Sequence, residues 1–210
     1  MTRPRAHVRV AVIAAALALG VTGCSQAPQA SQPEKNRGAE KAERVIEGHS
    51  YKVDSGPAAA AAFPMNANVF EGKVVALKPD VRAVDKLDDG SEFEVVYTPV
   101  VIRVTTVHKG TLKPGADVVV RSMGGTADGV TYRTEEAPAK ETFAKGRSLF
   151  VFGGALEAVD SETAPAITPH FVYRESGAAY VDATYASGSS GASVSKSTLR
   201  SHVGVRNSGS

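Results

Sequence analysis

The sequence predicts an all-β domain, built as an antiparallel barrel or sandwich of about seven short strands. After Phe63 the chain consists of short runs rich in Val, Ile, Thr, Tyr and Phe, which are the residue types enriched in strands. Clusters of Gly, Pro and Asp separate these runs, as turns separate strands. No segment of this region has a long helical stripe of apolar residues, so an antiparallel barrel or sandwich explains the pattern most simply.

The predicted strands are short runs of β-branched and aromatic residues with turn residues on both sides. They are 69–77, 94–107, 117–123, 130–135, 148–152, 170–174 and 179–185. Lys109-Gly110 and Pro114-Gly115 predict the turn between the second and third strands, and Asp128-Gly129 predicts a turn before the fourth.

Alternation of apolar residues is clearest in the second predicted strand. Val100, Ile102 and Val104 are two residues apart and therefore face the same side of a sheet. Residues 149–152 supply further core candidates. Pro99 has no N–H, so it must lie at an edge, a bulge or the start of its strand.

After the last predicted strand the chain changes character. Residues 188–191 (GSSG) predict a flexible loop, and 197–203 predict a short C-terminal helix with a serine cap. We therefore expect a single β-rich domain over residues 63–203, followed by a tail at 204–210.

The order of these elements is similar to that of OB-like barrels of the netrin and tissue-inhibitor type. The similarity spans residues 69–152 and rests on Val69-Phe70-Glu71-Gly72-Lys73-Val74, on Val100, Ile102, Val104 and Val107 before Lys109-Gly110, on Pro114-Gly115 before Val118 and Val120, and on Phe143, Gly146, Leu149 and Phe152. The resemblance implies a protease-inhibitor-like role. Eukaryotic members contain disulfides, and the inhibitors bind zinc through a free N-terminal cysteine, whereas Cys24 is the only cysteine here.

Residues 1–23 have the features of a signal peptide. Arg3, Arg5 and Arg9 make the start basic, and residues 10–21 are an apolar run of 12 residues. At 1.5 Å per residue this run is too short to cross a hydrocarbon core of about 30 Å.

Val21-Thr22-Gly23-Cys24 resembles the lipobox of bacterial lipoproteins. The resemblance implies cleavage between Gly23 and Cys24 and a diacylglyceryl thioether on Cys24, with acyl chains such as palmitate. Two chains hold a protein firmly to a bilayer, whereas one binds only marginally. We therefore expect a lipoprotein on the extracytoplasmic face of the cell membrane, similar overall to uncharacterised actinobacterial lipoproteins; the alternative is an ordinary secretory signal with a chance cysteine.

Residues 24–62 predict a lipidated N-terminus and a flexible linker. From Ser25 to Ser50 the chain is rich in Gln, Ala, Pro, Glu and Lys, with no period that would bury a face. Pro57 and the alanine run 58–62 predict either the end of this linker or the lip of the fold.

The charge of the chain excludes a nucleic-acid-binding class. When the three leader arginines are subtracted from the 24 Lys and Arg residues, 21 basic residues remain against 22 acidic ones. A nearly neutral domain with interspersed charges has no electrostatic footprint for nucleic acid.

Motifs that could carry chemistry are weak. Ser193-Val194-Ser195-Lys196 has the Ser-x-x-Lys spacing of penicillin-recognising enzymes, but their accompanying S-D-N and K-T-G motifs are absent from the sequence. The histidines outside the leader have no metal-ligand spacing; they are His49, His108, His170 and His202.

Three other groups suggest binding. The acidic residues around Gly90 suggest Ca²⁺ or, more simply, a solvated turn; they are Asp85, Asp88, Asp89, Glu92 and Glu94. The backbone N–H groups of Met123-Gly124-Gly125-Thr126 could cradle an anion, but with neither a following helix nor a lysine in register the segment favours an ordinary loop. The aromatic residues suggest either a stacking face or core packing; they are Tyr97, Tyr132, Phe171, Tyr173, Tyr180 and Tyr185.

The sequence predicts no catalytic residue, metal or cofactor, and it favours a non-catalytic binding or interaction module. The expected partners are the membrane, through the lipid, and an envelope protein, a wall polymer or a small ligand. The alternatives are an envelope hydrolase whose Ser, His and Asp meet only in space and a protease-inhibitor-like module.

Overall fold

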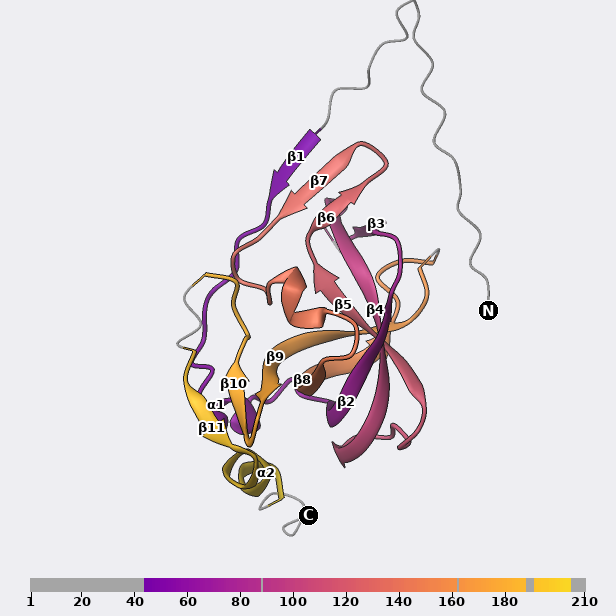
Figure 1. Ribbon diagram of the computed structural model, residues 1–210. Coiled ribbons are helices and arrows are strands. Elements are labelled where there is room, and N and C mark those ends of the chain that lie inside the picture. The colour runs from indigo at the N-terminus through magenta and orange to yellow at the C-terminus, as the bar shows by residue number, and fades with distance from the viewer. Residues whose placement is uncertain (1–43, 88, 162, 188–190, 205–210) are drawn as a thin grey trace, which may run out of the picture. The chain divides into compact units, whose positions relative to one another are not determined.

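Two β-sheets form the part of the chain that the structure describes (Figure 1). The computed structural model describes residues 44–87, 89–161, 163–187 and 191–204. The predicted signal peptide, Cys24 and the tail beyond Gly204 lie outside these residues, as do Asp88 and the loop at 188–190.

All seven predicted strands are present. The larger sheet contains β2 (Asn68–Leu77), β3 (Val81–Lys86), β4 (Glu92–Lys109), β5 (Asp117–Met123), β8 (Ser148–Glu157), β9 (Ala166–Ser176), β10 (Ala179–Asp182) and β11 (Ser193–Ser195). The smaller sheet contains β1 (Arg44–Glu47), β6 (Gly125–Ala127) and β7 (Val130–Arg133). The helical elements are α1 (Pro57–Ala62), α2 (Lys196–Gly204) and the 3-10 turn η1 (Lys140–Phe143).

The larger sheet curls so that its two halves face one another. β4 pairs with β2 and β5, and β8 pairs with β2 and β9, all in antiparallel fashion. β5 meets β9 through one parallel pair, Val120 with Ile167. This short seam makes the fold sandwich-like rather than a closed barrel. The curled part of the sheet consists of β2, β4, β5, β8 and β9, and an OB-like barrel has the same number of strands. The OB-like resemblance itself stays a prediction.

Alternate residues of β2, β8 and β9 enter two different cores. The inner core lies inside the curl and contains Phe70, Val151 and Val172, with the predicted Val100, Ile102 and Val104 of β4. The outer core lies on the opposite face of the same strands. It contains Val69, Phe150, Phe152, Phe171 and Tyr173 from the sheet, with Ala60, Tyr180, Leu199 and Val203 above them.

Pro99 and Gly72 mark two irregular points in the sheet. Along one edge of β4 the pairing partner changes. β3 pairs with β4 as far as Tyr97, and β2 pairs with β4 from Val100 onward. Pro99 lies at this change, where a missing N–H interrupts no ladder. At Gly72, a Cβ would lie 2.5 Å from Ile102 Cγ2 and 2.8 Å from the Arg103 carbonyl, so only glycine allows this approach of β2 to β4.

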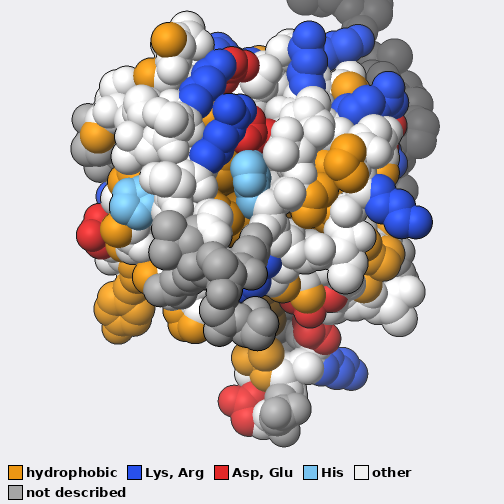
Figure 2. Space-filling model, turned by 90° about the horizontal axis from the view of Figure 1, so that it is seen from below, with side chains coloured by type: hydrophobic (Ala, Val, Ile, Leu, Met, Phe, Trp, Pro, Cys, Tyr) orange, Lys and Arg blue, Asp and Glu red, His pale blue; other side chains and the backbone are white. Residues whose placement is uncertain are grey.

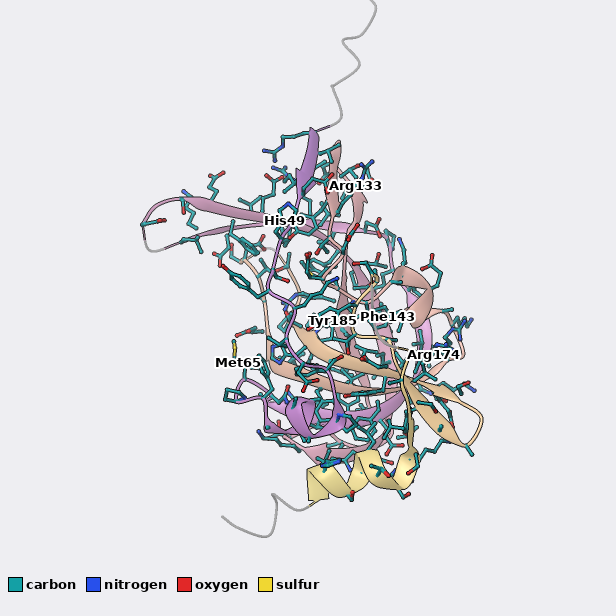
Figure 3. All side chains as sticks on the ribbon, turned by 90° about the vertical axis from the view of Figure 1, so that its left-hand side faces the viewer. His49, Met65, Arg133, Phe143, Arg174 and Tyr185 are labelled. Atoms are coloured by element: carbon teal, nitrogen blue, oxygen red, sulfur yellow. The ribbon has the colours of Figure 1, made fainter. Side chains whose placement is uncertain are left out.

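The chain packs on the domain before the predicted boundary at residue 63. β1 pairs in parallel with β7, and residues 48–56 then run to α1 (Figure 3). Ala60 of α1 is 0 % exposed and belongs to the outer core. The described part of the predicted linker therefore carries a strand and a helix that contact the sheets.

The predicted C-terminal helix is present as α2. Ser195 provides its serine cap, because the Thr198 N–H donates to Ser195 Oγ at 3.0 Å. Leu199 and Val203 point into the outer core, so the helix covers the end of the sheet seen at the bottom of Figure 1.

We predict that Leu199→Ala lowers the free energy of unfolding by about 2–4 kcal/mol, because the change leaves a cavity in the outer core. Leu199 is 0 % exposed, whereas Leu156 of β8 is 51 % exposed and provides a matched control. Urea unfolding of the two variants measures the difference. Equal losses in Leu199→Ala and Leu156→Ala would contradict the packing of α2.

Candidate functional site

A cavity of about 500 Å³ lies between residues 52–57 and the segment that contains β10 and β11. One wall is Lys52, Val53, Asp54, Ser55, Gly56 and Pro57, and the other contains Tyr173, Asp182, Tyr185, Ala192, Ser193 and Val194. Residues 52–56 of the first wall lie in no helix or strand, and Pro57 begins α1. Side chains must therefore hold this wall in place.

Two tyrosines hold this wall. The Tyr185 hydroxyl accepts from the Val53 N–H at 2.9 Å and donates to the Val53 carbonyl at 3.0 Å. The Tyr173 hydroxyl donates to the Ser55 carbonyl. Figure 3 shows the chain running from His49 past Tyr185 toward α1. The backbone polar groups of an irregular segment are thereby satisfied by side chains.

Two carboxylates and one ammonium line the cavity. Asp182 is 5 % exposed and accepts from Ser55 Oγ and, at 3.0 Å, from the Thr184 N–H. Asp54 accepts from the Gly56 N–H at 2.8 Å. Neither forms an ion pair with a residue of the described chain. Lys52 Nζ donates instead to the carbonyl and hydroxyl of Ser187, at 2.7 and 2.9 Å.

The negative charge of Asp54 and Asp182 also affects the pKa of Tyr173. Burial raises this pKa, and the charges of Asp182 and Asp54 raise it further. The Tyr173 hydroxyl therefore stays protonated and remains a donor to the wall.

A second polar cluster surrounds Glu71 of β2, which is 7 % exposed on the outer face. Arg200 of α2 donates to both carboxylate oxygens, at 2.8 and 2.7 Å. Tyr180 donates to Oε2 at 2.8 Å, and His108 Nε2 lies 2.9 Å from Oε1. His108 also stacks on Phe150, with ring centroids 4.9 Å apart.

These donors control the pKa of Glu71. Burial raises it, but the hydrogen bonds from Arg200, His108 and Tyr180 outweigh burial, and the pKa falls from 4.5 to about 2. A carboxyl that is ionised throughout the neutral range and saturated with donors is a poor general base. The cluster instead fastens α2 and β10 to the sheet.

The same end of the molecule carries charges of both signs. Lys196 pairs with Glu175, and its Nζ lies 5.8 Å from the centroid of the Tyr180 ring. Figure 2, which views the molecule from below, shows Lys and Arg side chains beside Asp and Glu side chains on this face.

The structure separates the Ser-x-x-Lys pair. Ser193 lines the cavity from β11, whereas Lys196 begins α2 and pairs with Glu175. The Lys196 amine therefore pairs with the Glu175 carboxylate, and the Ser-x-x-Lys spacing does not bring this amine to the Ser193 hydroxyl.

The predicted histidines do not gather in one place. His49 is exposed, and His108 contacts Glu71. His170 Nδ1 lies 3.1 Å from Asn66 Oδ1, and burial lowers the pKa of His170. His202 lies in α2. Among the described residues no group of three His, Cys, Asp or Glu side chains is placed to hold a metal ion.

The two suggested ion-binding loops bind the protein itself. In the acidic turn, Asp89 Oδ1 accepts from the Ser91 N–H at 2.9 Å, and Glu94 pairs with Arg82 and Arg44. In the glycine loop, the Thr126 N–H donates to Asp80 Oδ2 at 3.0 Å. The N–H group of this glycine loop therefore binds a carboxylate of the protein itself.

The aromatic residues do not form a stacking face. Five of the six are at most 9 % exposed and the sixth, Tyr132, is half-buried. Core packing, the other interpretation of these residues, is the one that the structure shows.

Sequence reasoning missed Glu71 and Asp182 as site residues. Each is a lone carboxylate within a short apolar strand, Glu71 between Phe70 and Gly72 and Asp182 after Val181. A charged residue at a position that the sheet buries has to find donors, and this pattern was the available indication.

Comparison with models of known protein families, with curated proteins and with solved structures gives no match for this chain. Within the described residues, the helices are too short or too polar to cross a bilayer. The function therefore has to be argued from the two sites above.

We predict that Glu71→Gln lowers the free energy of unfolding at pH 7 by about 3 kcal/mol, because the neutral amide loses the interactions that lower the pKa of the buried Glu71 carboxyl from 4.5 to about 2. The wild-type stabilisation is complete above the unfolded pKa of 4.5 and is lost as the pH falls toward 2. Urea unfolding between pH 2 and 7 tests this dependence.

The control for Glu71→Gln is Asp117→Asn. Asp117 pairs with Arg103 in an ion pair that is exposed to solvent, so its loss should cost much less than the loss of Glu71. An Asp117→Asn effect as large as that of Glu71→Gln, or an unchanged pH profile in Glu71→Gln, would refute the role of the cluster.

Proposed function

We propose that the chain is a binding module that takes a small ligand in the cavity between residues 52–57 and β10–β11, and that a lipid on Cys24 holds it at the extracytoplasmic face of the membrane. The observation that carries the binding role is the cavity itself. Its volume of about 500 Å³ falls within the range of about 300–1,000 Å³ typical of small-ligand sites.

The walls of the cavity support this role. Val53, Pro57 and Val194 contribute apolar surface, and Asp182, with its fixed hydrogen bonds, contributes an oriented polar group. A few placed polar groups on an apolar lining are what a specific small-molecule site requires. The tyrosine hydroxyls fix the wall before any ligand arrives, which lowers the entropy lost on binding.

Catalysis has less support than binding. Ser55, Ser193 and Asp182 line the cavity, but none of its described lining residues is a histidine. Ser55 donates directly to Asp182, so no general base lies between them, as it does in a hydrolytic triad. The inhibitor-like alternative has the OB-like resemblance as its only support.

The anchor is proposed on the match of residues 21–24 to a lipobox. Cys24 precedes the first described strand by twenty residues, since β1 begins at Arg44. This distance in sequence leaves a segment to separate a membrane-held N-terminus from the domain.

We predict that a clickable palmitate analogue labels the wild-type protein in bacterial cells and does not label Cys24→Ser. The thioether needs the sulfur of Cys24, so serine removes the attachment point. In-gel fluorescence and the mass of the N-terminal peptide measure the outcome. A wild-type protein that retains Met1, or whose Cys24 is free, would overturn the anchor.

We predict that Ser193→Trp blocks ligand binding, because the indole fills space in the cavity. Ser176, an exposed serine at the end of β9, gives the matched control Ser176→Trp. Amide chemical shifts of residues 52–56 and 192–194, recorded as small aromatic fragments are added, report binding. The proposal is supported if saturable shifts occur in the wild type and in Ser176→Trp but not in Ser193→Trp. The same shifts in Ser193→Trp as in the wild type would contradict it.

A further inference from the structure

We infer that the cavity selects an organic cation, an amine or a quaternary ammonium group that carries a small apolar body. This inference rests on the proposed binding function and names its ligand class.

The first argument is the uncompensated charge of the cavity. Asp54 and Asp182 line it without an ion-pair partner in the described chain, and the one lysine among its lining residues has its Nζ on Ser187. The net charge of the described lining is therefore −1. Asp182 is almost fully buried, so its charge is screened by solvent much less than that of a surface residue. An anionic ligand would be repelled, and a cation would be attracted.

The second argument is the composition of the walls. Tyr173 and Tyr185 line the cavity together with the two carboxylates and with Val53, Pro57 and Val194. The Tyr185 ring already has a cation beside it, because Lys52 Nζ lies 5.9 Å from the ring centroid, so the charge of a ligand belongs at the carboxylates and its apolar body at the remaining surface. A ligand with a charged amine and an apolar body matches both the carboxylates and this surface.

The third argument separates an organic cation from a metal ion. The backbone carbonyls of Val53 and Ser55 already accept the tyrosine hydroxyls. Asp182 uses both carboxylate oxygens, on Ser55 and on Thr184. A divalent ion such as Ca²⁺ needs six or more oxygens, whereas an ammonium group gains from the negative charge through a few hydrogen bonds or none.

The test compares three probes that share one ring: benzylamine, benzyl alcohol and benzoate. Each is titrated into the full-length protein at pH 7, and the amide shifts of residues 52–56 and 192–194 give the dissociation constants. We expect benzylamine to bind about tenfold more tightly than benzyl alcohol, a difference of about 1.4 kcal/mol. Benzoate should bind more weakly than both.

Variants assign the preference to the carboxylates. Asp54→Asn keeps an oxygen for the Gly56 N–H and should weaken benzylamine about fivefold, with benzyl alcohol unchanged. Lys52→Gln should strengthen benzylamine. Asp182→Asn should weaken benzylamine most, and its thermal unfolding shows whether it remains folded; Asp54→Asn decides the matter if it does not. Asp117→Asn, at an exposed pair away from the lining, is the control.

The outcomes distinguish the two proposals. If benzyl alcohol binds as tightly as benzylamine, or if Asp54→Asn leaves the preference unchanged, the cavity binds ligands but the cation inference is wrong. If none of the three probes shifts the cavity amides, the binding function fails and the inference falls with it. Tighter binding of benzoate than of benzylamine would reverse the sign of the proposed charge selection.

Discussion

The structure depends on covering the outer face of β2, β8 and β9. The inward residues of these strands fill the sandwich, yet their outward residues include Phe150, Phe152 and Phe171, which are also buried. Apolar surface of this size is stable only when another element removes it from water. The two ends of the described chain supply that cover: α1 from the N-terminal side, and β10 and α2 from the C-terminal side.

This cover explains both polar sites. Glu71 lies on the outer face, where the packing of α2 buries it. Arg200 of the same helix donates to both oxygens of the Glu71 carboxylate and balances its charge. The cavity lies where the two covering segments meet, between residues 52–57 and β10–β11. Buried carboxylates are stable only with donors around them. Glu71 has a guanidinium, whereas Asp182 has only neutral donors, and this contrast separates a structural cluster from a candidate binding site.

Much of the sandwich could be predicted from sequence, because alternation at Val100, Ile102 and Val104 and the turns at Lys109-Gly110 and Asp128-Gly129 report local geometry. β3, with the sequence VRAVDK, and the three-residue β6 and β11 were missed, since charge or shortness hides their period. The cavity could not be predicted: Val53 and Tyr185 are far apart in the chain, and only the fold brings the hydroxyl to that backbone. The aromatic residues agree with the core-packing interpretation, because β2, β8 and β9 bury side chains on both of their faces.

Hydrogen exchange at individual amides tests most directly whether the two ends of the described chain cover the outer face of the sheet. The Val53 N–H, bound by Tyr185, and the amide of Leu199 in α2 should be protected together with the amide of Val151 in β8, because the covering segments and the sheet form one cooperative unit. If the amides of residues 52–56 and α2 exchange as fast as those of an unstructured peptide while β8 stays protected, the ends of the chain do not cover the outer face, and the cavity between them has no fixed wall.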